Sequence, residues 1–410
     1  MLPLQDIRVL DFSTLLPGPL ASLILAEAGA EVIKVERPGT GEDMRGYPPR
    51  LGGGSGSFAI LNRGKRALAL ALRAPGAAES LLALAPTIDI VLEQFRPGVM
   101  DRLGLGYAEL SKRNPGLVYC SVSAYGHTGP DSHRAGFGLI AEAKSGIMAM
   151  VGSPGEAPPL LRIALGDMYT GIHGVAAICA ALLGRVKSGR GQHIDLALYD
   201  CLVSMHEYAV QCYTLSGGRE IPEQTGHDLP HSTLYGVFTA KDGHLVIAAQ
   251  VDEAWKRFAR LVGGEAFASD TRFHDAQGRN DHRLEILPRV RAWTGARTVG
   301  ECLAELDAVD VPCAKVQTIA DVLADPQIAA RNMVIEQDHP VLGKVRLANL
   351  PFRFSACDTT PTLPAPLLGQ HNREIARELG YPDAAVDAMV KGGVLYAETA
   401  VSRRASAGRG

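Results

Sequence analysis

Residues 7–35 read IRVLDFSTLLPGPLASLILAEAGAEVIKV, and this stretch decides the fold class. β-Branched residues at 7–10 are followed by a turn at 17–19, an apolar helical run from Leu20 to Ala28 and further β-branched residues at 31–35. Apolar residues in these two patterns predict a strand, a helix and a second strand that runs parallel to the first. The chain therefore opens with one βαβ unit.

The same alternation continues through the first 200 residues. Strands are predicted at 88–92, 117–122 and 193–198, and helices at 77–84 and 170–183. Strands that alternate with helices form parallel sheets with helices on both faces. We therefore expect an α/β fold whose large domain is a doubly wound, mostly parallel sheet.

The pattern changes after Leu215. Turn residues without an apolar period fill 216–230, which predicts a linker. Beyond the linker, two strand-like runs flank Lys241-Asp242-Gly243, a sequence typical of a hairpin turn, and helical runs follow. We expect a smaller α/β domain at 231–317 and a disordered tail at 402–410.

Composition excludes several classes of protein. The 410 residues are 46% hydrophobic, enough for a sizeable core in two domains. The net charge of −3 indicates neither a nucleic-acid partner nor a membrane surface. The N-terminus lacks a secretory pattern, and the longest apolar runs, near 176–183, fall short of the roughly 20 residues of a spanning helix. We expect a cytoplasmic protein with small-molecule ligands.

Known cofactor and catalytic motifs are missing. The turn at 13–19 has no G-x-G-x-x-G, and the nearest match to a P-loop, at 184–190, has Arg in place of the required Lys. The chain has no G-x-S-x-G, and its 12 His and 7 Cys lack the spacing of metal sites. NAD or FAD binding, serine hydrolysis and a metal centre are disfavoured, and we expect no tightly bound cofactor.

Asp167 stands where a long apolar helix begins. Aspartate is a favoured N-cap because its oxygens accept hydrogen bonds from the unpaired N–H groups of the first turn. The same position suits a nucleophile, because the positive helix end keeps a carboxylate ionised. The local sequence is compatible with both roles.

Two basic segments are candidates for anion binding. Three cations at 63–66 follow a glycine-rich loop at 51–57, and they could meet phosphates or simply form a solvated turn. Arg96 follows a predicted strand at its carboxyl end, where open α/β sheets bind ligands. Alternatively, Arg96 forms an ion pair with Glu93.

Several ordered motifs closely resemble those of the class III CoA transferases. They are GAEVIKVERPG at 29–39, FRPG at 95–98 with LGLGY at 103–107, GRGQH at 189–193, DPQ at 325–327 and LLGQH at 367–371. The resemblance covers nearly the whole chain. It implies a Rossmann-like large domain built from 1–215 and a return at 318–401, and two subunits interlocked as a homodimer.

The resemblance also implies roles for individual residues. In that family the nucleophilic aspartate belongs to a Gly-Asp pair ahead of the Gly-Arg-Gly-Gln segment, and here the pair is Gly166-Asp167. The implied CoA contacts are Lys34, Arg37, Lys65, Arg66, Arg96 and Arg102.

Two further groups of residues are candidates for contacts with the reacting acids. Oxyanion donors are expected from the turn at Leu16 to Gly18 or from a small-domain loop. Formyl-CoA transferase has glutamine at the position of Leu16, so oxalate/formate specificity is disfavoured. Arg162 and His231 are candidates for a second carboxylate, which favours succinyl-CoA or another dicarboxylic donor.

The racemase branch of the family carries a Gly-His-Asp triplet, and the matching residues here are Gly136-Phe137-Gly138. One of the two bases of a proton shuttle is therefore missing. We expect a CoA transferase that works through an aspartyl anhydride and an aspartyl-CoA thioester. An acyl-CoA racemase and a non-catalytic CoA-binding protein are the alternatives.

Overall fold

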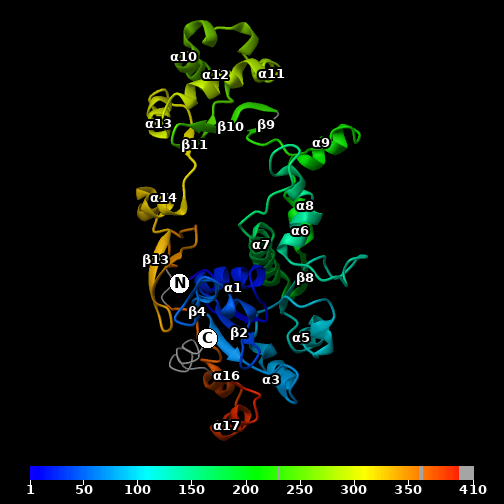
Figure 1. Ribbon diagram of the computed structural model, residues 1–410. Helices are drawn as coiled ribbons and strands as arrows, with labels where there is room; N and C mark the ends of the chain where they lie inside the picture. Colours follow the sequence, from blue (N-terminus) through cyan, green and yellow to red (C-terminus); the bar gives the residue numbers. More distant parts are fainter. Residues whose placement is uncertain (230, 360–362, 397–410) are drawn as a thin grey trace. The chain divides into compact units, whose positions relative to one another are not determined.

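The computed structural model describes residues 1–229, 231–359 and 363–396 (Figure 1). The chain forms two units. The first takes in the described residues of 1–147, 161–207 and 329–410, and the second those of 148–160 and 208–328. The predicted tail at 402–410 lies outside the described residues.

A six-stranded parallel sheet forms the centre of the first unit. Along the sheet its strands are β5 (Arg66–Ala69), β2 (Glu31–Glu36), β1 (Arg8–Asp11), β6 (Ile90–Glu93), β7 (Val118–Ser123) and β8 (Gln192–Ala197). The chain begins at the centre and builds outward on one side and then on the other. The parallel sheet predicted from the sequence is confirmed. The strand β5 was missed, because it begins within the basic segment that was interpreted as a turn.

Helices cover both faces of this sheet. They are α1 (Pro17–Glu27), α2 (Gly56–Asn62), α3 (Ala77–Leu84), α4 (Val99–Arg102), α5 (Tyr107–Arg113), α6 (Gly138–Lys144), α7 (Leu165–Ser188) and α8 (Leu198–Ser204). Successive strand residues point to opposite faces. Accordingly, Val9 packs in the core with residues of α1 and α7, whereas Leu10 packs in the core with residues of α3.

The helix α7 packs closely on α1. A Cβ placed at Gly171 would lie 2.7 Å from the Pro17 carbonyl oxygen, and one at Gly174 would lie 3.7 Å from Ala21 Cβ. By length and composition α7 could cross a membrane, although its unbroken apolar runs are short. Core helices of water-soluble proteins can have the same length and composition.

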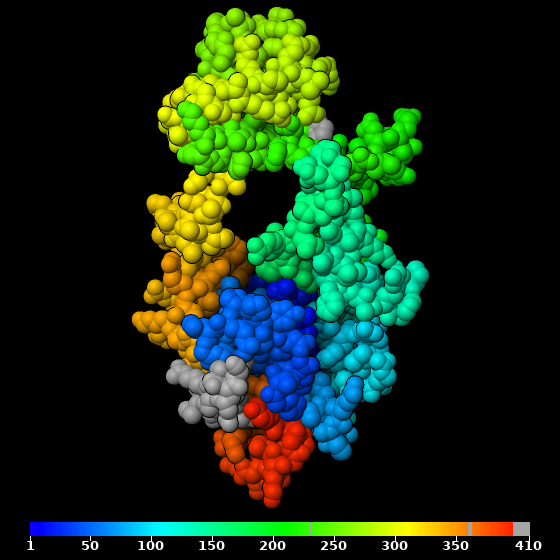
Figure 2. Space-filling model, in the orientation of Figure 1, coloured from blue at the N-terminus to red at the C-terminus, as the bar shows by residue number. Residues whose placement is uncertain are grey.

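The C-terminal part of the first unit returns to the edge of the sheet. It contains β13 (Val334–His339), β14 (Gly343–Ala348), α16 (Asn372–Glu378) and α17 (Asp383–Lys391). The N–H of Ala67 on β5 donates to His371 Nδ1 (3.0 Å), and that of Ala69 donates to Asn372 Oδ1 (2.9 Å). These bonds cover an otherwise open strand edge. In Figure 2 the red C-terminal helices accordingly lie beside the blue N-terminal part.

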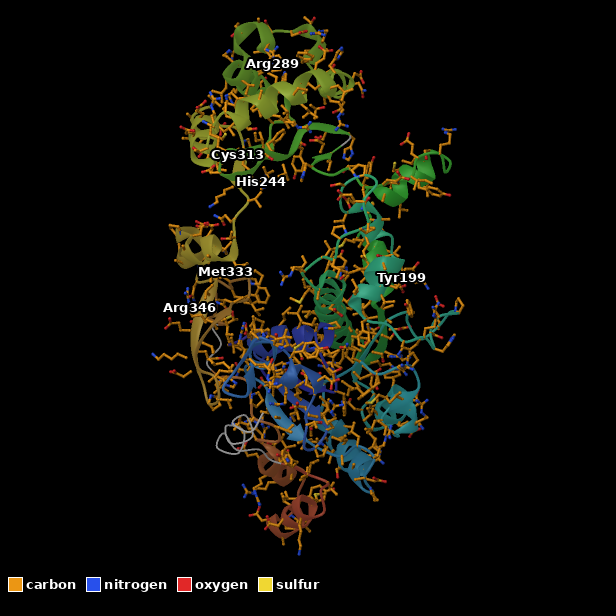
Figure 3. All side chains as sticks on the ribbon, in the orientation of Figure 1. Tyr199, His244, Arg289, Cys313, Met333 and Arg346 are labelled. Atoms are coloured by element: carbon orange, nitrogen blue, oxygen red, sulfur yellow. The ribbon has the colours of Figure 1, made fainter. Side chains whose placement is uncertain are left out.

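The second unit is built on a four-stranded sheet. Its strands, in order, are β12 (Cys313–Lys315), β11 (Gly243–Ala248), β10 (Ser232–Ala240) and β9 (Asp228–Leu229). The pairing of Ala240 with Gly243 confirms the predicted hairpin. Figure 3 labels His244 on β11 and Cys313 on the neighbouring strand β12. The helices are α9 (Ala209–Leu215), α10 (Asp252–Ala268), α11 (Ala276–Asp281), α12 (Arg283–Gly295), α13 (Val299–Ala308), α14 (Ile319–Ala324) and, at the boundary, α15 (Pro326–Ala330).

The units do not begin and end where the sequence pattern changes. Residues 148–160 belong to the second unit, and residues 216–229, the described part of the linker expected at 216–230, lie inside it. Hydrogen bonds explain this difference: Gln224 Nε2 donates to the Val151 carbonyl (2.7 Å), and the Gly226 N–H donates to the Gly152 carbonyl (2.9 Å). Turn composition alone cannot reveal such pairing.

Candidate active site

Asp167 is the third residue of α7, so it lies in the first turn and is not the N-cap. The helix begins at Leu165, and the residue before it, Ala164, makes no side-chain cap. A different helix supplies the cap, because the Gly166 N–H donates to Oε1 of Glu142 on α6 over 3.0 Å. The prediction that Asp167 caps its own helix is therefore wrong. Its carboxylate is left free for another task.

The Asp167 carboxylate accepts no hydrogen bond from the described part of the chain. It faces Gly138, the first residue of α6, so closely that a Cβ at Gly138 would lie 2.7 Å from Asp167 Cγ. Burial, and secondly the charge of Glu142, raises the pKa of Asp167 to about 6. The sequence favoured an easily ionised carboxylate at the positive helix end, but the loss of water outweighs that effect. The result is a partly buried, unpaired and basic carboxylate.

The turn between β1 and α1 lies beside this nucleophile candidate. Gly171 is four residues after Asp167, so both lie on one face of α7, and Gly171 packs against the Pro17 carbonyl. The N–H of Gly18 is already donated to Gln94 Oε1 (3.2 Å). The N–H of Leu16 donates to no group among the described residues. Of the N–H groups predicted in this turn as oxyanion donors, that of Leu16 is therefore the one without an acceptor among the described residues.

A buried ion network lies beneath this turn. Lys34 Nζ donates to the Ser13 carbonyl (2.9 Å) and lies 3.2 Å from Glu42 Oε1. Glu42 in turn accepts the N–H of Leu15 over 2.7 Å, and Leu15 has a left-handed backbone with φ of 63°. The network therefore holds the turn in a conformation that non-glycine residues rarely adopt.

Lys65 belongs to the same network. Its ammonium donates to Ser22 Oγ (2.7 Å), Asn62 Oδ1 (2.8 Å) and the Pro19 carbonyl (3.0 Å), and it lies 3.4 Å from Asp11 Oδ2. Burial lowers its pKa to about 7. The side chains of Lys34 and Lys65 are both fully enclosed. The resemblance implied CoA contacts for these two lysines, but their burial supports a structural role instead.

Arg37 and Arg66 already have partners. Arg37 is exposed and binds Asp43, and its Nε donates to Thr40 Oγ1 over 2.8 Å. Arg66 binds Glu31 and lies 2.7 Å from Glu378 Oε1. Any contact of these arginines with CoA would compete with an ion pair inside the protein.

Arg96 and Arg102 are available for a ligand. Both are exposed, and neither guanidinium has an acceptor among the residues that the structure describes. They flank Gly98, and a Cβ placed at Gly98 would lie 3.2 Å from Arg102 Nη1. Glu93 instead accepts the N–H of Phe95 (2.8 Å), so the alternative ion pair between Arg96 and Glu93 does not form.

A pocket of about 250 Å³ opens beside Arg96 and Gly98 at the carboxyl ends of β6 and β7. Its wall includes Glu93, whose pKa burial raises to about 7, and His193, which stacks on Tyr107 with ring centres 5.5 Å apart. This is the edge of the sheet at which open α/β folds bind ligands.

The two candidates for a second carboxylate lie in different units. Arg162 belongs to the first unit and is exposed, without an acceptor among the described residues. His231 belongs to the second unit and stacks on Tyr208 with ring centres 4.5 Å apart. It lines a hollow of about 440 Å³ with Tyr235 and Arg279. Within the described residues, no three His, Cys, Asp or Glu side chains come together to hold a metal ion.

The comparisons with known proteins agree with the motifs. A family model described as CoA-transferase family III matches residues 4–372. The chain belongs to this family. It is an enzyme of the CoA-transferase type. Acyl-CoA thioesters and carboxylic acids as its substrates are consistent with the family and its relatives.

Curated relatives of the family III chain cover nearly its whole length. Succinyl-CoA–D-citramalate CoA-transferase of Chloroflexus aurantiacus is 37% identical, over 92% of this chain and 94% of the relative. Succinyl-CoA:glutarate CoA-transferase of Mus musculus is 32% identical, over 96% and 91%. Acetyl-CoA:oxalate CoA-transferase of Acetobacter aceti is 33% identical, over 93% and 97%.

Solved structures of family members share the fold. A CAIB/BAIF family protein from Brucella suis is 34% identical with a TM-score of 0.81, covering 92% of this chain and 99% of that one. The protein Rv3272 from Mycobacterium tuberculosis is 31% identical with a TM-score of 0.80, covering 90% and 98%. The mixed α/β architecture with a large parallel sheet is therefore that of the family.

Sequence reasoning missed Glu142 and the contact between Gly138 and Asp167. Gly138 was considered only as a position that lacks a base. Glu142 lies four residues later on the same face of α6, and the residue is 1% exposed. A charged residue within a short apolar helix was the one available signal, and by itself it does not identify a partner.

Proposed function

We propose that this family III enzyme transfers CoA from succinyl-CoA, or another dicarboxylic acyl-CoA, to an acceptor carboxylic acid, with Asp167 as the covalent nucleophile. The observation that carries the proposal is the state of the Asp167 carboxylate. It is partly buried, it accepts no hydrogen bond from the described residues, and its pKa is raised to about 6. A carboxylate with few partners and little hydration is a stronger nucleophile.

The proposed reaction begins with a covalent exchange on Asp167. The carboxylate attacks the carbonyl of the donor thioester, the C–S bond breaks, and CoA leaves as a thiolate. The product on the enzyme is a mixed anhydride of Asp167 and the donor acid. The thiolate then attacks the aspartyl carbonyl, which releases the donor carboxylate and leaves an aspartyl-CoA thioester.

The second half repeats these steps with the acceptor. The acceptor carboxylate attacks the aspartyl thioester, which forms a second anhydride and releases the thiolate. The thiolate attacks the acceptor acyl carbonyl, so the new thioester leaves and the Asp167 carboxylate is restored. No proton is gained or lost, and the thioester energy is kept if water is excluded.

Neighbouring groups support this chemistry. The N–H of Leu16, which has no acceptor among the described residues, lies in the turn beside α7 and could donate to the oxyanion that forms at each attack. Arg96 and Arg102, whose guanidinium groups are unpaired within the described ranges, are available to CoA phosphates. The position that faces Asp167 is Gly138, which carries no titratable group, so the two-base shuttle of a racemase has no second base there.

The choice of a dicarboxylic donor rests on two observations. Relatives that match almost the whole chain are named for succinyl-CoA as donor. Arg162 is exposed three residues before α7 and has no acceptor among the described residues, so we assign it to the second carboxylate. A cytoplasmic location and an interlocked homodimer remain predictions from the sequence.

Trapping of the intermediate tests the proposal. The enzyme is incubated with succinyl-CoA and hydroxylamine, digested and examined by mass spectrometry. A hydroxamate on the peptide that carries Asp167 is expected, and Asp167→Asn should give none while it still binds CoA. Turnover by Asp167→Asn at the wild-type rate would disprove the mechanism. Deuterium uptake at the α-carbon of the acyl group in heavy water, without any acceptor, would instead indicate a racemase.

A further inference from the structure

The first turn of α7 packs against one face of α6. Gly138 and Glu142 are four residues apart, so they lie on the same side of α6. Gly138 contacts the Asp167 carboxylate, and Glu142 accepts the N–H of Gly166. Both residues of the Gly166-Asp167 pair are therefore held by the same face of a second helix.

Glu142 occupies an unusual place for a charged side chain. It is 1% exposed, and a buried carboxylate is costly unless it is compensated. The one hydrogen bond of its side chain among the described residues comes from a backbone N–H that would otherwise be unpaired at the helix start. An alanine or leucine would fill the core at lower cost, so the carboxylate calls for an explanation beyond packing.

We propose that Glu142 is a positioning residue for the nucleophile. It fixes the first turn of α7 through Gly166, and its carboxyl group lies on the same face of α6 as Gly138, which contacts the Asp167 carboxylate. This inference rests on the proposed function of Asp167. A like charge close to a partly buried carboxylate disfavours its ionised form, so the ionised form is more basic and reacts more readily with a carbonyl carbon.

The other charged residues on the elements packed against α7 are either paired with other groups or exposed. The helices and strands packed on α7 carry Lys144 on α6, Asp200 on α8, Glu27 on α1, and His193 and Asp195 on β8, whereas β7 carries the neutral Tyr119 and Cys120. Lys144 binds Asp131 and lies over the rings of Tyr125 and Tyr199, the latter labelled on α8 in Figure 3. Glu27 binds Arg63, Asp195 accepts the His127 N–H, and Asp200 is exposed. The pKa of Asp167 is raised by burial first and by Glu142 second.

Two substitutions separate the roles of Glu142. Glu142→Gln keeps an oxygen that can accept the Gly166 N–H but removes the charge, whereas Glu142→Ala removes both. For Glu142→Gln we expect the acid limb of kcat/KM for the acyl-CoA donor to move down by at least about half a pH unit. We also expect Tm at pH 7.5 to rise slightly, because the substitution removes the same repulsion between the two carboxylates. For Glu142→Ala we expect kcat to fall at least about tenfold, because the turn that aims Asp167 loses its cap.

A double-mutant cycle on thermal stability, called the stability cycle below, tests the coupling between Glu142 and Asp167 without measuring turnover. The change in Tm caused by Asp167→Asn at pH 7.5 is measured in the wild-type and in the Glu142→Gln background. A smaller gain in the Glu142→Gln background supports the proposal. Equal gains together with an unmoved acid limb would overturn it. Glu109→Gln, on the exposed surface of α5, is the matched control and should change neither readout.

The outcomes also separate this inference from the proposed function. If the wild-type enzyme forms no adduct on Asp167, the proposed function fails, whereas the stability cycle still reports whether the two carboxylates interact. If Glu142→Gln does not fold, Glu142→Asp takes its place. That variant keeps a carboxylate but moves its oxygens away from the Gly166 N–H. We therefore expect kcat to fall while the acid limb of kcat/KM stays in place. A shift of this acid limb would contradict the proposal.

Discussion

The Cα of Gly138 lies directly against the carboxylate of Asp167, so that an added Cβ would come within 2.7 Å of Asp167 Cγ. Gly138→Ala should therefore push the nucleophile aside. Because the displaced atoms are the end of a flexible side chain, the fold should survive. We expect kcat to fall on the order of 100-fold, the effect of misplacing a reacting group by about 1 Å. Steady-state kinetics and Tm together measure this.

Gly184→Ala is the matched control for this substitution. It lies on the exposed side of α7, and nothing is within 4 Å of a Cβ placed there. Alanine should leave kcat unchanged and raise Tm slightly, because it favours a helix over glycine by about 1 kcal/mol. An equal loss of activity in both variants would show that the contact between Gly138 and Asp167 has no special role.

Asp167→Asn should stabilise the protein at neutral pH. The pKa of Asp167 is raised from 3.8 to about 6, so the folded state holds the proton more tightly than the unfolded state. Wild-type stability therefore falls as pH rises from about 4 to about 6, and the full penalty applies above pH 6. Since the group is partly exposed, the penalty should be on the order of 1–3 kcal/mol.

Thermal unfolding at pH 4.5 and pH 7.5 measures this difference. Asp167→Asn should exceed the wild-type Tm at pH 7.5 and approach it at pH 4.5. Glu156→Gln, which removes an exposed carboxylate, should not reproduce the pattern. A gain from Asp167→Asn that is equal at both pH values would contradict a raised pKa.

The sequence was informative where structure depends on neighbours along the chain. Residues 7–35 gave the first strand, helix and strand, and the helix at Ala77–Leu84 was predicted to the residue, because apolar period and turn residues are local signals. The turn at Lys241-Asp242 likewise followed from its own residues.

Contacts between distant segments were beyond the sequence patterns. The capping of Gly166 by Glu142 joins two helices, and the edge of β5 is covered by His371, which lies 304 positions away. Lys34 and Lys65 resembled surface cations because their acidic partners, Asp11 and Glu42, lie elsewhere along the chain. A charge that is balanced only in three dimensions gives no periodic signal.

Arg96 and Arg102 should contribute to CoA binding. Each is exposed and unpaired among the described residues, so Arg96→Gln or Arg102→Gln removes a cation without breaking an ion pair. Loss of one charge-assisted contact with a phosphate should raise the Kd for CoA about tenfold and leave kcat nearly unchanged. Calorimetric titration with CoA measures the effect. Lys112→Gln on α5 is the control, and a Kd that stays at the wild-type value in both arginine variants would reject the assignment.

Lys65→Met should act through stability rather than through KM. The lysine is buried and supports Asp11, Ser22 and Asn62, so its removal leaves a buried carboxylate without one of its cations. We expect a loss of about 3 kcal/mol in unfolding free energy. Denaturant unfolding and the Kd for CoA are compared. Weak CoA binding with unchanged stability would instead restore the ligand contact implied by the family resemblance.

Arg162 should distinguish dicarboxylic from monocarboxylic acyl groups. Its guanidinium is exposed shortly before α7 and has no acceptor among the described residues, so it can pair with the far carboxylate of a succinyl group. Arg162→Met should raise KM for succinyl-CoA about tenfold and leave the Kd for free CoA unchanged, because CoA lacks that carboxylate. Lys187→Met, near the C-terminal end of α7, should change neither value. If Arg162→Met weakens succinyl-CoA and free CoA equally, Arg162 binds a part of the molecule common to both, and the dicarboxylic donor loses its structural support.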